Sequence, residues 1–244
     1  MANFNTHLTG AFVSSGIMGL VVYKAGMLVG SEFLLCSVVG TIGGLLPDID
    51  LEHSVPARIG FNVLSLLLAF GMVIYWSPQL SLVELMITWL LTYIIMRWGV
   101  FTIFSSMTVH RGIVHSVPYM AVLALSLVYI SFYLMKYTVV FSWFMGLFLF
   151  FGSMVHLLLD EMYSVNVFGL RLKKSFGTAI KFFDTQQKSW YIGLYLVLAI
   201  LLIFAPSYRV FWQTLSDPIS WALLQQNLLP AGMSLPNIPK IAIK

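Results

Sequence analysis

The sequence predicts an all-α protein, a polytopic transmembrane helical bundle of about seven spans. Three observations support this prediction. Of the 244 residues 59% are hydrophobic and only 9% are charged, whereas a soluble domain has about 25% charged residues. The chain contains repeated apolar stretches that approach or reach the length of a membrane span. Its few polar clusters lie at the ends of these stretches.

Charge and cysteine content exclude several classes of protein. The net charge is only +4, and the basic residues are too few for a nucleic-acid surface, so no nucleic-acid partner is expected. The single Cys36 excludes an intrachain disulfide and a Cys-x-x-Cys metal site. The first lysine is Lys24, so the positive n-region of a cleavable signal peptide is missing, and His7 is expected to remain in the mature protein.

Seven apolar stretches define the expected spans. They cover residues 8–23, 32–46, 59–76, 80–104, 117–135, 138–160 and 190–206. The first two are short for a span of about 20 residues. The Gly26-x-x-x-Gly30 and Gly40-x-x-x-Gly44 spacings nearby predict a close approach of helix backbones.

The chain is expected to divide into two parts. Residues 1–206 form a membrane-embedded domain, and residues 207–244 form an interfacial C-terminal tail. Within the tail, Ser216-Asp217-Pro218 predicts the start of a helix. Trp212 and Trp221 are of the type that lies at a membrane interface.

The order of the spans predicts which loops share a side of the membrane. If each span crosses once, the N-terminus and the segments 47–58, 105–116 and 161–189 lie together. That side carries seven cations and the other side five. The seven are Arg58, Arg111, Arg171, Lys173, Lys174, Lys181 and Lys188, and the five are Lys24, Lys136, Arg209, Lys240 and Lys244. Because cytoplasmic loops carry the Lys/Arg excess, this shared side is expected to be cytoplasmic.

Four polar motifs fall on this shared side. His7 lies near the start, Asp48 and Asp50 follow Pro47, and His156-x-x-x-Asp160 places an imidazole and a carboxylate on one helix face. The fourth motif is His110-Arg111-Gly112-Ile113-Val114-His115-Ser116, in which Gly112 permits a tight backbone that turns both rings toward one point. Ser116 fits an N-cap of the next span better than a hydrogen-bond donor to a ligand histidine.

Each motif alone has a structural explanation, either a turn with solvated carboxylates or a His–Asp pair inside a bundle. Taken together, ionisable groups at the membrane boundary favour a metal site at one membrane face. The candidate ligands are His7, Asp48, Asp50, His110, His115, His156 and Asp160. Such nitrogen and oxygen donors fit a divalent cation, Zn²⁺ best, in one to three ions.

These motifs also carry a family resemblance. Thr6-His7-Leu8, Leu45-Leu46-Pro47-Asp48-Ile49-Asp50, the His110–Ser116 motif and His156-Leu157-Leu158-Leu159-Asp160 resemble the motifs of YdjM-like metal-dependent hydrolases. These are bacterial inner-membrane proteins, some of them described as LexA-regulated. The resemblance covers roughly residues 5 to 185. Through a remote relation to zinc-dependent phospholipase C and P1-type nucleases, it implies a helical fold, two or three metals and phosphoester hydrolysis.

The chain departs from the family pattern in two places. Leu51-Glu52 separate the second aspartate from His53, which makes His53 a weak ligand candidate. A Thr-Pro-rich turn after Asp160 is replaced by a basic segment within 171–188. That segment either anchors the protein by the positive-inside rule or attracts anionic lipid headgroups.

We therefore expect a membrane-bound hydrolase that uses metal-activated water on a lipid-like or lipid-linked phosphoester. Asp48 or Asp50 would bridge two ions, and Arg111 would neutralise charge on a phosphate oxygen. Asp160 either binds metal or accepts a hydrogen bond from a ligand histidine.

Two other classes of function compete with this reading. A non-catalytic metal-binding protein or a transporter is the main alternative, although transport sites lie nearer the membrane midplane. A purely structural subunit would leave the motif clustering unexplained. The oligomeric state and the substrate headgroup stay open.

Overall fold

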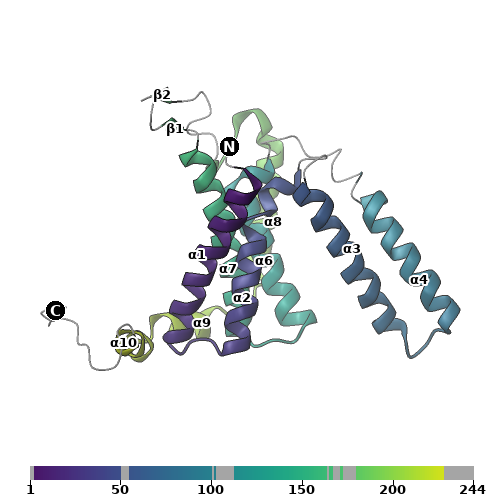
Figure 1. The fold of residues 1–244 in the computed structure, drawn as a ribbon, viewed down its shortest axis with the longest axis horizontal. Helices are drawn as coiled ribbons and strands as arrows, with labels where there is room; N and C mark the ends of the chain where they lie inside the picture. Colours follow the sequence, from purple (N-terminus) through teal and green to yellow (C-terminus); the bar gives the residue numbers. More distant parts are fainter. Residues whose placement is uncertain are drawn as a thin grey trace, which may run out of the picture.

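The computed structural model describes residues 3–50, 55–100, 102, 113–163, 165–166, 171–172 and 180–227; the side chains at 49, 50, 55–61, 64, 67, 165–166 and 171–172 are not described. Over these residues the protein is almost entirely helical (Figure 1), which confirms the predicted fold class. The sheet found in this part of the chain is a two-residue antiparallel ladder of β1 (Val165–Asn166) and β2 (Arg171–Leu172).

Seven long helices lie within the described residues. They are α1 (Phe4–Lys24), α2 (Gly30–Gly43), α3 (Val55–Trp76), α4 (Leu82–Ile94), α6 (Val117–Tyr129), α7 (Val139–Met162) and α8 (Lys188–Ile203). Shorter turns extend or join them: 3₁₀ turns η1 (Leu46–Asp50), η3 (Ile113–His115) and η5 (Thr185–Gln187), and π-turns η2 (Ile95–Val100) and η4 (Ile130–Leu134). The chain then continues through α9 (Arg209–Ser216) and α10 (Pro218–Gln226).

Six helical segments of the described chain are long and apolar enough to cross a membrane. They are Phe4–Lys24, Gly30–Asp48, Leu82–Val100, Val117–Leu134, Val139–Met162 and Thr185–Ile203. Helix α3 occupies the remaining expected position and has 22 residues. At 1.5 Å per residue it is about 33 Å long, which matches a hydrocarbon core of about 30 Å. The prediction of a polytopic bundle is therefore confirmed.

Helix α7 lies at the centre of the bundle and packs against α1, α2 and α6, while α8 packs on α6. The α3–α4 hairpin stands apart from these helices (Figure 1) and meets the bundle mainly at η1. The start of α1, the end of α2 and the starts of α3, α6 and α8 lie at one end of the molecule, as do the ends of η2 and α7. This arrangement agrees with the alternating spans that the sequence predicts. Helices α9 and α10 lie at the opposite end.

Glycines allow α2 and α7 to touch along their backbones. A Cβ atom on Gly152 would collide with the carbonyl oxygen of Gly40, and one on Gly43 would collide with that of Leu149. Across the same seam, the Ser153 hydroxyl donates a hydrogen bond of 3.0 Å to the Gly43 carbonyl. The close approach predicted from the Gly40-x-x-x-Gly44 spacing is confirmed.

The same prediction is wrong for Gly26-x-x-x-Gly30. Gly26 has a φ of +72° in the turn after α1, so it is needed for a left-handed conformation and not for helix packing. A Cβ atom on Gly30 would meet no atom within 4 Å. Two glycines four residues apart lie on one helix face only when a single helix contains both, and α1 ends at Lys24.

The tail begins with two short helices, which lie at the end of the molecule opposite to the polar motifs. In α9, Phe211 is buried and its ring centroid lies 5.0 Å from that of Phe144 in α7. Helix α10 starts as predicted, because Asp217 accepts hydrogen bonds from the amides of Ile219 and Ser220 and Pro218 follows it. Hydrogen bonds from Ser220 and Ile219 hold the pKa of Asp217 below its usual value, so the cap stays ionised.

Candidate metal centre

The centre of the candidate site is His156, which is fully buried on α7. Its Nδ1 atom lies 2.7 Å from the carbonyl oxygen of Gly44, at the end of α2. Because a carbonyl can only accept, Nδ1 carries the proton and donates this hydrogen bond. The Nε2 atom then holds a lone pair. The glycine seam makes this contact possible, since Gly152 and Ser153 lie one turn before His156 on the same helix.

Two carboxylates lie near this lone pair. Asp48 Oδ1 is 3.6 Å and Asp160 Oδ2 is 4.0 Å from His156 Nε2. Both distances exceed a hydrogen bond, and Nε2 has no hydrogen-bond partner among the described residues. Neighbouring ligands of a tetrahedral zinc ion with bonds of 2.0–2.1 Å are about 3.3 Å apart. The observed spacing is therefore close to the spacing of ligands around an ion.

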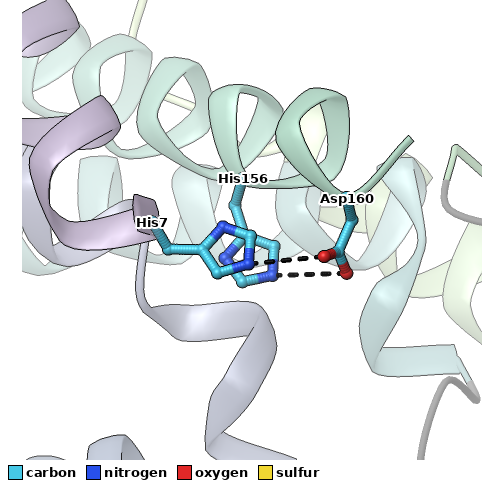
Figure 2. A group of neighbouring side chains, drawn as sticks. All are labelled: His7, His156 and Asp160. Atoms are coloured by element: carbon cyan, nitrogen blue, oxygen red, sulfur yellow. Dashed lines mark ion pairs between the residues drawn. The ribbon is translucent and has the colours of Figure 1, made fainter. Parts of the chain in front are cut away.

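His7 approaches from α1. Its ring stacks on that of His156 with centroids 3.7 Å apart and an interplanar angle of 13°. Its Nε2 atom lies 3.3 Å from Asp160 Oδ1, and Figure 2 shows both rings directed toward this carboxylate. Asn3 fixes the start of α1 one turn earlier, because its side chain accepts a hydrogen bond of 2.8 Å from the Thr6 amide.

Asp48 and His115 complete the cluster from two short 3₁₀ turns, η1 and η3. The His115 Nε2 atom lies 3.9 Å from Asp48 Oδ1, and its ring stands edge-on to that of His156 with centroids 5.8 Å apart. Ser116 follows at the N-cap position of α6 as predicted, but its hydroxyl donates to the Ile113 carbonyl and makes no side-chain cap. This hydrogen bond instead closes the turn that holds His115.

The five residues form two overlapping groups, each able to hold a metal ion. One group is His7, His156 and Asp160, and the other is Asp48, His115 and His156; within each group the ligand atoms lie within 4.8 Å of one another. His156 belongs to both. Four of the five residues are at most 2% exposed, whereas the Asp48 side chain is 14% exposed. Within the cluster, solvent therefore has access mainly on the side of Asp48.

Not every predicted site residue can be placed. The structure brings together His7, Asp48, His115, His156 and Asp160, although they are up to 153 positions apart in the sequence. The Asp50 backbone belongs to η1, but its side chain lies outside the described residues. His110, Arg111 and His53 also lie outside them. Their roles, and the metal-binding role of the clustered five, stay predictions.

No sequence pattern directly marks one member of the site, the carbonyl oxygen of Gly44. This atom fixes the tautomer of His156 and so decides which ring nitrogen lies beside the carboxylates. Because every residue has a backbone carbonyl, no residue type marks such a role. The Gly40-x-x-x-Gly44 spacing was the one available signal, since it indicated that another helix would come close at this point.

Comparison with known proteins identifies a family. A family model described as YdjM inner membrane protein matches residues 1–224, a range that contains all five clustered residues and α9. No curated protein and no solved structure matches the chain.

Proposed function

The chain belongs to the YdjM inner membrane protein family, and on this premise we propose that it is a membrane-bound, metal-dependent hydrolase of lipid-like or lipid-linked phosphoesters. One observation carries the metal-binding part of the proposal. The unprotonated nitrogen of a buried histidine lies beside two carboxylates at distances too long for hydrogen bonds. A divalent cation between them could be coordinated by all three groups.

The same distances argue against a purely structural role for the His156 imidazole. Carboxylates and an unprotonated imidazole nitrogen are all acceptors, so they do not stabilise one another at these distances. A structural His–Asp pair would be expected within about 3.2 Å, yet His156 Nε2 lies 3.6 Å from Asp48 and 4.0 Å from Asp160. Mixed nitrogen and oxygen donors with no cysteine fit Zn²⁺ or a similar borderline cation.

The residues can be given separate tasks. His7 and Asp160 would bind an ion together with His156, and Asp48 and His115 would supply the ligands of the second group around the same ring. Asp48 is also the clustered carboxylate nearest to solvent, so it is placed to orient a water molecule and accept its proton. Arg111 would neutralise charge on a phosphate oxygen. A bound cation would supply Lewis acidity and lower the pKa of water.

The position of the site supports the proposal of a lipid-like substrate. The cluster stands at one end of the membrane-spanning helices, beside the starts of α1, α6 and α8 (Figure 1). A phosphoester at the headgroup level of a lipid would reach this depth without leaving the membrane. The Lys/Arg balance of the sequence supports a cytoplasmic site. The motif resemblance implies a remote relation to zinc-dependent phospholipase C and P1-type nucleases, and on this expectation we propose phosphoester chemistry.

Metal analysis followed by a lipid assay tests this proposal. Protein purified in detergent should contain a stoichiometric divalent metal and should release phosphorylated headgroups or phosphate from a panel of lipid phosphoesters. Asp48→Asn should abolish release, and a chelator should do so reversibly. Metal without turnover on any lipid would identify a non-catalytic metal-binding protein. Folded protein that contains no metal, and that binds none when metal is added, would contradict the proposal altogether.

A further inference from the structure

A pocket of mixed polarity lies at the end of the molecule opposite to the His/Asp cluster. It has a volume of about 380 Å³ and forms where α2 begins and where the turn between η4 and α7 closes. Its lining includes Ser31, Glu32, Leu35, Lys136, Thr138 and Phe141. The pocket therefore combines a carboxylate, an ammonium group and hydroxyl groups, none of which the proposed function uses.

The two charged groups of this pocket are not paired with each other. Glu32 is half-buried, and its Oε2 atom accepts a hydrogen bond of 3.0 Å from the Val29 amide. The Lys136 ammonium is exposed and makes neither a hydrogen bond nor an ion pair with any residue that the structure describes. Opposite charges that line one pocket without meeting leave room for a ligand that carries both signs of charge.

The backbone at Lys136 also points to a task for its side chain. Its φ is +59°, and it is the only non-glycine residue with a positive φ in the described part of the chain. Glycine adopts this conformation without a steric cost, whereas other residues rarely do. Residues kept in such a conformation are found mainly at functional sites. A lysine at a position that favours glycine is therefore consistent with a binding role for the ammonium group.

The pocket changes from polar to apolar toward the interior of the membrane. Leu35 lies one turn after Glu32 in α2. Phe141 lies one turn after Thr138 in α7, and both helices run from this end toward the His/Asp cluster (Figure 1). Thr138 and Asp160 are 22 residues apart, which corresponds to about 33 Å along the helix. Because this length matches the hydrocarbon core, the pocket lies at the headgroup level of the leaflet opposite to the cluster.

We propose that this pocket binds a phospholipid whose headgroup carries both a primary ammonium group and a phosphate, as in phosphatidylethanolamine. The ammonium group donates hydrogen bonds to Glu32, and Lys136 and the Thr138 hydroxyl donate to the phosphate oxygens. Leu35 and Phe141 contact the first part of an acyl chain. A choline headgroup has no N–H to donate to Glu32, and a headgroup with only negative charge is repelled by it. This site does not depend on the hydrolase proposal.

Native mass spectrometry of the full chain tests the proposal. Protein is released from nanodiscs that contain phosphatidylethanolamine, phosphatidylcholine and phosphatidylglycerol in equal amounts. It should retain the ethanolamine lipid at least about fivefold better than either of the others, since hydrogen bonds between charged partners are the strong ones.

Glu32→Gln should abolish the preference for the ethanolamine lipid over the choline lipid. Glutamine still offers an acceptor to the Val29 amide, so the start of α2 is kept. Lys24→Gln is the matched control, because Lys24 lies at the end of α1 on the same side of the molecule but lines a different pocket. This control should keep the whole preference.

Lys136→Gly separates a binding role from a structural one. Glycine adopts the φ of +59° without strain, so thermal stability should not fall. Retention of the ethanolamine lipid should nevertheless fall by about fivefold, because one cation near the membrane surface has been lost.

Three results would overturn the inference. Unchanged retention in Lys136→Gly or an unchanged preference in Glu32→Gln would show that the two charges do not bind one headgroup. Better retention of phosphatidylglycerol than of the ethanolamine lipid would show that the lysine attracts any anionic lipid. Loss of bound lipid on addition of inorganic phosphate would indicate a site for free phosphate. Metal content should stay at the wild-type value in every variant, which keeps this test apart from that of the metal centre.

Discussion

At the scale of single residues, His156 connects the two halves of the candidate site. Its Nδ1 proton is held by Gly44, and its Nε2 atom belongs to both ligand groups. Loss of this side chain therefore removes a donor from each group, whereas loss of His7 or His115 would affect only one.

We expect His156→Ala to lower metal occupancy of the purified protein by at least tenfold, because even residues that only orient ligands change metal affinity about 10–100-fold. His7→Ala and His115→Ala should each have a smaller effect. Elemental analysis by mass spectrometry after purification in detergent measures these changes.

The matched control is His53→Ala, which removes a histidine that the sequence makes a weak ligand candidate and should change occupancy little. Equal metal loss in His53→Ala and His156→Ala would show that the cluster has been wrongly assigned.

At the scale of elements, the α2–α7 seam positions the site. Gly152 meets the Gly40 backbone directly, and backbone atoms cannot move aside as a flexible side chain can. The seam places the Gly44 carbonyl at His156 and brings η1, with Asp48, to the end of α7. Helix packing and ligand geometry are therefore coupled.

Gly152→Ala should force α2 and α7 apart and destabilise the protein by about 1–3 kcal/mol, the usual cost of overpacking. Metal occupancy should fall with it, because the ligands of η1 and α7 separate. Thermal unfolding in detergent, together with metal analysis, measures both effects.

Gly16→Ala and Gly193→Ala are the controls, since a Cβ atom there would meet nothing within 4 Å. In a helix interior this change should be neutral or stabilising by up to about 1 kcal/mol. A Gly152→Ala protein as stable as these controls would disprove the close seam.

At the scale of the whole molecule, the helices alternate so that the ends beside the site share one face. Reporter fusions after Ser54, Ser105 and Lys188 should all give a cytoplasmic signal, because the Lys/Arg excess lies on that face. A fluorescent protein and alkaline phosphatase, fused at the same positions, report the two sides. A periplasmic signal at any of the three positions would contradict the common face.

The tail should be dispensable for metal binding, because α9 and α10 lie at the end opposite to the cluster (Figure 1). Truncation after Pro206 should leave metal occupancy unchanged. Thermal stability should fall, since the truncated protein loses the packing of Phe211 on Phe144. A folded truncated protein without metal would show that the tail supports the site from a distance.

The sequence by itself determined the membrane class, the positions of the spans and the face that the polar motifs share. Hydropathy identifies a span because about 20 apolar residues match the hydrocarbon thickness. Alternation of spans then assigned His7, Asp48, His115 and Asp160 to one side. The sequence also proposed the Gly40–Gly44 approach correctly, although the same spacing at Gly26 and Gly30 belonged to a turn.

Only the tertiary structure decided how these residues meet. A span that is apolar on all sides gives no sign of which face contacts a neighbouring helix, because lipid and protein accept the same side chains. The pairing of α2 with α7, the stacking of His7 on His156 and the hydrogen bond to the Gly44 carbonyl all depend on that choice. Residue types could name the candidate ligands, but helix packing set their distances and the ring nitrogen of His156 that lies beside the carboxylates.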